Sequence, residues 1–111
     1  MSSLRVAVAS SDGKYVNQHF GHAQQFLIFD LQDNGKYKFI ELRKNAPSCS
    51  GGVGNSDARE KTLDVLEDID VVLVSQIGPG AVKSLISRGI QPYKTPTFIA
   101  EALKELAPKI K

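Results

Sequence analysis

A run of four large apolar residues, Val71 to Val74, constrains the fold more than any other part of this sequence. Successive side chains of a strand point to opposite faces of a sheet, so a strand that is apolar at every position is buried on both faces. Helices provide that double cover where they connect parallel strands. The run therefore predicts an interior parallel strand with helices on both sides of its sheet.

Four further segments predict strands. Short runs rich in β-branched and aromatic residues occur at 4–9, 26–31, 37–42 and 90–94. The turn residues Asp33 to Gly35 predict that the second and third strands form an antiparallel hairpin. Within 37–42 the apolar positions change phase, which predicts either a bulge or partial cover of both faces.

Apolar residues that recur every three or four positions predict three helices, which begin near Ser56 or Asp57, at Pro79, and after Thr95 or Thr97. Their expected inward residues are Thr62, Leu63, Leu66 and Ile69; Ala81, Val82, Leu85 and Ile86; and Phe98, Ile99, Ala102, Leu103 and Leu106. The order β-β-β-α-β-α-β-α predicts an α/β fold. Its sheet is mixed and five-stranded, with one edge hairpin and helices on both faces.

Length and composition limit both the architecture and the ligands. A chain of 111 residues fits a single domain over 1–111. The only cysteine, Cys49, excludes an intramolecular disulfide, a four-cysteine zinc site and a self-contained iron–sulfur site. A net charge of +2 does not suggest a nucleic-acid partner. Because neither a leader-like segment nor a membrane span of about 20 apolar residues is seen, we expect a cytoplasmic protein with no membrane partner.

Two loops contain residues that commonly bind metals. His19 and His22 lie in the loop after the first strand, and imidazole suits iron, copper, nickel and zinc. Cys49 lies in the second loop, beside Gly51 and Gly52, and its thiolate is a soft metal ligand. The other interpretation is that the histidines are ordinary exposed loop residues and that the cysteine is incidental.

A third segment, Ser75 to Gly80, follows the apolar strand and leads into a helix. Ligands of open α/β sheets bind at the carboxyl ends of strands, and helix amino termini attract anions through their backbone amides. Gly78 and Gly80 are therefore candidate binding residues, although the same turn would also serve only to reverse the chain. The sequence contains no nucleotide-binding glycine motif.

These segments, in this order, resemble the dinitrogenase iron–molybdenum cofactor biosynthesis family, the NifX/NafY-type domain that also occurs at the carboxyl end of NifB. The resemblance implies a ribonuclease-H-like three-layer fold. It also implies a non-enzymatic protein that binds or carries an iron–sulfur or molybdenum-containing cluster between donor and acceptor proteins. The metal-contacting residues would be His19 and Cys49, and the wider cluster site would include His22, Gly51, Gly52, Gly78 and Gly80.

The sequence also bears on two other functions. A cofactor-free protein-interaction or regulatory module is favoured by Ser50 and Val53, which replace histidines found in many relatives. A metal-dependent nuclease is disfavoured, because such chemistry needs carboxylates on the first strand and at the end of the apolar strand. The first strand, at 4–9, has no acidic residue, and Ser75 follows the other.

Overall fold

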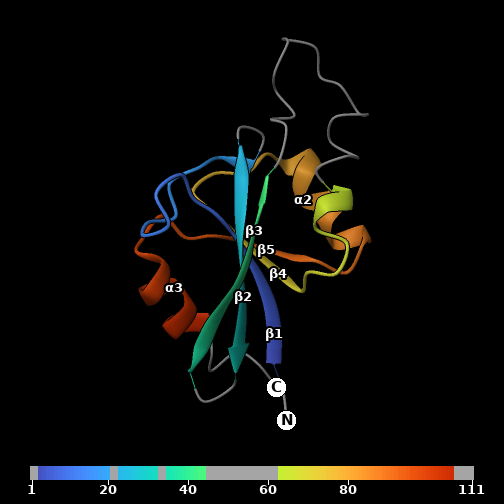
Figure 1. Cartoon of the computed structure of the whole chain (residues 1–111). Coiled ribbons are helices and arrows are strands. Elements are labelled where there is room, and N and C mark those ends of the chain that lie inside the picture. Colours follow the sequence, from blue (N-terminus) through green and yellow to red (C-terminus); the bar gives the residue numbers. More distant parts are fainter. Residues whose placement is uncertain (1–2, 21–22, 33–34, 45–62, 107–111) are drawn as a thin grey trace.

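The computed structural model describes residues 3–20, 23–32, 35–44 and 63–106. Its elements are β1 (Ser3–Ala9), β2 (Gln25–Gln32), β3 (Tyr37–Lys44), β4 (Val71–Val74), α2 (Pro79–Ser87), β5 (Gln91–Lys94) and α3 (Ile99–Leu106). The strands form one five-stranded sheet in the order β3-β2-β1-β4-β5 (Figure 1). β2 pairs antiparallel with both β1 and β3, whereas β4 pairs parallel with β1 and β5. The predicted mixed sheet with an edge hairpin is confirmed.

Helices cover both faces of the sheet, as the apolar run of β4 predicts. Figure 1 shows α3 on one side and α2 on the other, and we call these sides the α3 face and the α2 face. Val71 and Leu73 belong to the core under α3, while Val72 and Val74 belong to the core under α2. All four side chains are at most 4% exposed. No helix in the described part of the chain has the length and apolarity that a membrane crossing requires.

The first predicted helix is described only from Leu63 onward, and its expected start lies outside the described residues. Its inward residues Leu63, Leu66 and Ile69 are buried against the α2 face, as predicted. Two other predicted inward residues are wrong, because Ile86 is 52% and Phe98 is 58% exposed. In α2 the buried positions are Ala81 and Leu85, and Ile86 is turned away from them. Phe98 precedes α3, and its ring packs edge-on against Tyr15 with 5.2 Å between centroids.

β3 contains the predicted bulge. Phe39 lies opposite Phe29 and Leu42 lies opposite Leu27, so the register shifts by one residue and Ile40 is the extra residue of β3. Phe29 and Leu27 belong to the core under α3. The bulge therefore keeps Phe39 and Leu42 on the α3 face although they are three positions apart.

An ion network on the α2 face ties β3 to the segment before β4. The Arg43 guanidinium donates hydrogen bonds to both carboxylate oxygens of Asp68, at 2.6 and 2.9 Å, and to the Val65 carbonyl at 2.7 Å. It also pairs with Glu41 at 3.0 Å, while Arg5 donates to Asp68 at 3.3 Å. The hydrogen bonds from Arg43 lower the pKa of Asp68 well below its usual value of 3.8.

This network predicts a contribution to the free energy of unfolding that is lost at acid pH. A carboxyl whose pKa is lowered on folding stabilises the protein above its unfolded pKa, and that contribution is lost as the pH falls toward the folded pKa. Because the Asp68 side chain is 42% exposed, we expect solvent to limit the loss between about pH 5 and about pH 2 to about 1 kcal/mol. Urea unfolding of Asp68→Asn should lack this part of the pH dependence, whereas Glu67→Gln should retain it. Identical pH profiles for the wild type and Asp68→Asn would contradict the assignment.

Candidate functional site

The loop that follows β1 brings His19 to the carboxyl end of β4. His19 and Gln76 form an isolated parallel β-bridge. On either side of this bridge, the Phe20 amide donates to the Gln76 carbonyl at 2.9 Å and the Ser75 amide donates to the Gln18 carbonyl at 3.0 Å. Backbone hydrogen bonds therefore fix the histidine segment beside the turn that leads to α2.

A buried phenylalanine anchors the same segment. Phe20 is 1% exposed and belongs to the core of the α2 face. Its ring lies 6.2 Å from that of Phe26, measured between centroids. The neighbouring His19 is exposed. An inward phenylalanine thus holds an outward imidazole at the protein surface.

The beginning of the loop has a structural role. The Asp12 carboxylate accepts hydrogen bonds from the amides of Lys14, at 2.9 Å, and Tyr15, at 3.0 Å, and from the buried Ser10 hydroxyl at 3.1 Å. The two backbone amides are the main cause of the lowered pKa of Asp12. Gly13 completes the turn with a φ of +74°, a conformation that favours glycine. Asp12 therefore stabilises the turn at the beginning of the loop.

The turn into α2 presents backbone groups at the same edge of the sheet. Gly78 caps the helix without a side chain, and Pro79 occupies its first turn, as predicted. Gly78, Pro79 and Gly80 are all exposed. The first amides of a helix have no partner within that helix, and its amino terminus carries a partial positive charge. Such a terminus suits an anionic ligand.

The structure brings only part of the predicted site together. His19 lies beside the turn that contains Gly78 and Gly80, because its bridge partner Gln76 is two residues before Gly78. Within the described ranges, no three His, Cys, Asp or Glu side chains are grouped to hold a metal ion. The remaining predicted site residues lie outside the described residues: His22, Cys49, Gly51 and Gly52.

Gln76, which positions His19, was not among the site residues predicted from the sequence. Its contribution is a backbone carbonyl and a β-bridge, which any residue type supplies. The only available signal is the prediction that both segments follow parallel strands, whose carboxyl ends meet at one edge of the sheet.

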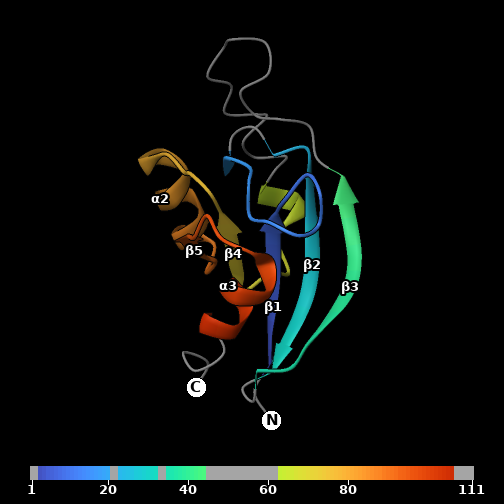
Figure 2. The same cartoon turned by 90° about the vertical axis from the view of Figure 1, so that its left-hand side faces the viewer.

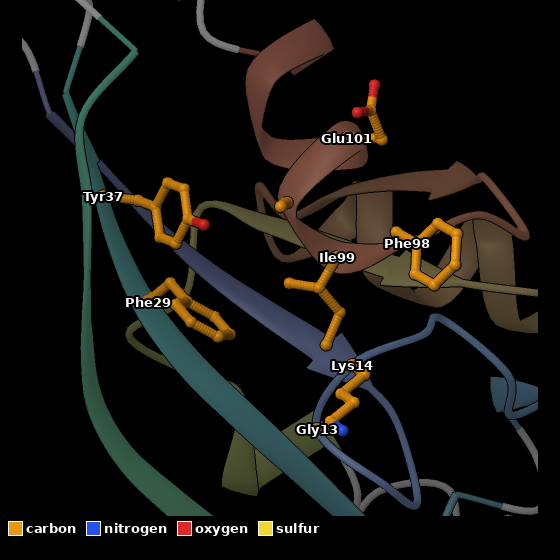
Figure 3. A pocket seen from close by; sticks show the side chains of 8 residues that line it. Gly13, Lys14, Phe29, Tyr37, Phe98, Ile99 and Glu101 are labelled. Carbon is orange, nitrogen blue, oxygen red and sulfur yellow. The ribbon is translucent and has the colours of Figure 1, made fainter.

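A separate groove lies between β3 and α3. Its volume is about 450 Å³, and Phe29, Tyr37, Phe98 and Ile99 form most of its apolar lining. Lys14 and Glu101 also line it, and Figure 3 shows these side chains around the opening. Because none of these residues belongs to the His19 segment or the Gly78 turn, the groove is distinct from the predicted cluster site.

Solved structures share the fold of this chain. The crystal structure of PH0822 has a TM-score of 0.70 and 24% identity, covering 97% of this chain and 93% of that chain. The NMR structure of TM1290 from Thermotoga, a candidate NifB protein, has a TM-score of 0.60 and 18% identity, covering 96% of this chain and 88% of that one. At these identities the likeness shows the fold alone. The ribonuclease-H-like label for that fold stays a prediction.

The chain is also similar to part of longer proteins named FeMo cofactor biosynthesis protein NifB. It is 39% identical over 93 residues to the protein of Sinorhizobium fredii, which covers 84% of this chain and 19% of the relative. The Azotobacter vinelandii protein is 38% identical over 93 residues, which covers 78% of this chain and 18% of the relative. This chain therefore spans about a fifth of the length of these relatives.

A family comparison covers nearly the whole chain. Residues 2–109 match the family described as dinitrogenase iron-molybdenum cofactor. The matched range includes both histidines, the cysteine and the turn into α2. The chain therefore belongs to the dinitrogenase iron–molybdenum cofactor family, as the resemblance in its sequence predicted.

Proposed function

We propose that this chain is a non-enzymatic cytoplasmic protein that binds and carries an iron–sulfur or molybdenum-containing cluster, or a precursor of one. Membership of a cofactor family supports a cluster-related role. The observation that carries the proposal is the β-bridge between His19 and Gln76, which holds an exposed imidazole next to the amino terminus of α2.

The two groups at this edge suit different parts of such a cargo. A neutral imidazole binds iron through one ring nitrogen. Metal–sulfide clusters are anionic, so the first amides of α2, near Gly78 and Gly80, would complement their charge. Cys49, which lies outside the described residues, is the proposed second metal ligand. His22, Gly51 and Gly52, also outside them, complete the proposed site.

An open site of this kind favours transfer over permanent storage. His19 and the Gly78–Gly80 turn are exposed, so a cargo bound there would stay accessible to a second protein. With one thiolate and two imidazoles in the whole chain, few protein ligands need to be replaced when the cargo leaves. We propose donor and acceptor proteins for the cluster as the partners.

Anaerobic titration tests this function. The probes are a thiolate-capped synthetic iron–sulfur cluster and, separately, tetrathiomolybdate, with binding followed by absorbance. We expect the His19→Ala/Cys49→Ala variant to bind at least about ten-fold more weakly than the wild type, a difference of about 1.4 kcal/mol. Lys83→Ala, an exposed change on α2, should bind like the wild type.

The fold of each variant is checked by thermal unfolding. Because His19 is exposed, its replacement should leave the melting temperature almost unchanged. Equal affinities of the wild type and the double variant for both probes would remove these residues from the function. That result would favour the alternative, a cofactor-free protein-interaction module, which the exposed apolar side chains of β3 also favour.

A further inference from the structure

The outer strand of the sheet exposes an unusual number of apolar side chains. β3 lies at one edge of the sheet (Figure 2), and no strand in the described part of the chain pairs with its outer side. Tyr37, Phe39, Ile40 and Leu42 are 45%, 50%, 39% and 42% exposed, respectively. Contiguous apolar surface on a free edge marks an interaction site or an aggregation liability.

Between Tyr37 and Leu42, the charged residues of β3 lie on the other face. Lys38 is opposite Asp30 and Glu41 is opposite Ile28, a member of the core under α2. Tyr37, Phe39 and Leu42 are opposite residues of the core under α3. From Tyr37 to Leu42, β3 thus presents apolar side chains on the α3 face, and one positive and one negative charge on the α2 face.

We propose that a second copy of this chain covers this edge, with the two β3 strands paired antiparallel about a two-fold axis. In the proposed register Phe39 of each copy lies opposite Ile40 of the other. Tyr37 then lies opposite Leu42, and Lys38 lies opposite Glu41. Each pair occurs twice, so the dimer joins apolar side chains on the α3 face and opposite charges on the α2 face. Such cross-strand pairs are the main stabilising contacts between neighbouring strands.

The bulge selects this register. Ile40 shifts the alternation of side-chain faces along β3 by one residue. Residues of the same face therefore lie opposite each other on both sides of the bulge only when the bulges of the two copies are adjacent. Moving the register by two residues would place residues of different faces opposite each other, either Ile40 with Glu41 or Lys38 with Phe39, and would separate Lys38 from Glu41. A bulge hinders pairing with a regular strand, but two copies of β3 present the same irregularity to each other. The strand is therefore better matched to itself than to an arbitrary edge.

The contact area favours a reversible dimer. Pairing involves six of the eight residues of β3 from each copy, Tyr37 to Leu42, so the interface is smaller than the standard size of about 1,600 Å². We therefore expect a dissociation constant in the micromolar range, on the order of 10 µM. This inference does not depend on the proposed cargo, because the surface is separate from His19 and the turn into α2.

Sedimentation equilibrium of the cluster-free chain from about 1 µM to about 1 mM, a range that spans the expected dissociation constant, tests the proposal. We expect Lys38→Glu and Glu41→Lys each to raise the dissociation constant at least about ten-fold, because each creates two like-charge pairs. The variant that combines Lys38→Glu with Glu41→Lys restores both opposite-charge pairs and should dimerise within about three-fold of the wild type, since such paired changes compensate. Recovery of this kind identifies the register, because no other contact predicts it.

Two further variants distinguish a loss of dimerisation from a loss of the fold. Glu41 accepts a hydrogen bond from Arg43 in its own chain, so Phe39→Thr provides a change that leaves that contact intact. Phe39→Thr should also weaken the dimer at least about ten-fold, whereas Ile86→Thr, an equally exposed apolar site on α2, should not. Circular dichroism confirms that each variant is folded. A monomer at every concentration would overturn the proposal, as would a dimer unaffected by both Phe39→Thr and the charge reversals.

Discussion

Replacing Phe20 by alanine is expected to lower the free energy of unfolding by about 3–5 kcal/mol, the usual cost of removing a buried aromatic side chain. Phe20 is 1% exposed and packs in the core of the α2 face, where its ring lies against Phe26. Domains of this size have a total stability of about 5–15 kcal/mol, so the loss is a large part of the whole. Urea unfolding at equilibrium measures it.

The matched control is Phe98→Ala, which removes the same side chain from an exposed position. Phe98 is 58% exposed, and its described ring contact is with Tyr15, so we expect a cost of about 1 kcal/mol. Equal costs at the two positions would contradict the anchoring role of Phe20. Phe20→Leu, which refills part of the cavity, should recover more than half of the lost stability.

Leu103→Ala is expected to cost about 2–5 kcal/mol, because the change leaves a cavity between α3 and the sheet. Leu103 is 0% exposed and lies in the same core as Val8, Phe29 and Leu73. Within the described residues, α3 is the helix that covers this face. Urea or thermal unfolding gives the value.

Ile86→Ala is the control for this second change, because it also shortens an aliphatic side chain within a helix. Ile86 is 52% exposed on α2, so its loss should cost less than about 1 kcal/mol. A cost for Leu103→Ala as small as that of Ile86→Ala would show that α3 does not seal the core of this face.

Hydrophobic patterning was sufficient to predict the sheet. The fully apolar run from Val71 to Val74 indicated cover on both faces, and β4 is buried between α2 and α3 as expected. The phase change in β3 left two interpretations open, and the register at Ile40 shows a bulge. Patterning was less informative for the helix ends. It assigned Ile86 and Phe98 to the core, but a stripe of apolar residues does not specify where the surface that it covers ends.

The candidate site was predictable in its residue types and only partly in its geometry. Loop histidines and a glycine-rich turn are visible in the sequence because their chemistry belongs to the side chain or to glycine itself. The connection between them is a pairing of the Phe20 amide with the Gln76 carbonyl. Backbone groups are common to nearly all residues, so no pattern of residue types indicates such a pairing. The proposed contribution of Cys49 stays a prediction.

The central position of β1 has a consequence for the order of folding. β1, β2 and β3 are neighbours in both the sequence and the sheet, whereas β4 joins β1 across more than sixty intervening residues. Contacts between distant parts of a chain form slowly because a long loop must first be closed. The His19 segment needs both sides of this junction, since it follows β1 and pairs with the residue after Ser75. We therefore expect the histidine segment to become ordered late in folding, and protection of the Phe20 amide from hydrogen exchange would report when the two halves of the sheet have joined.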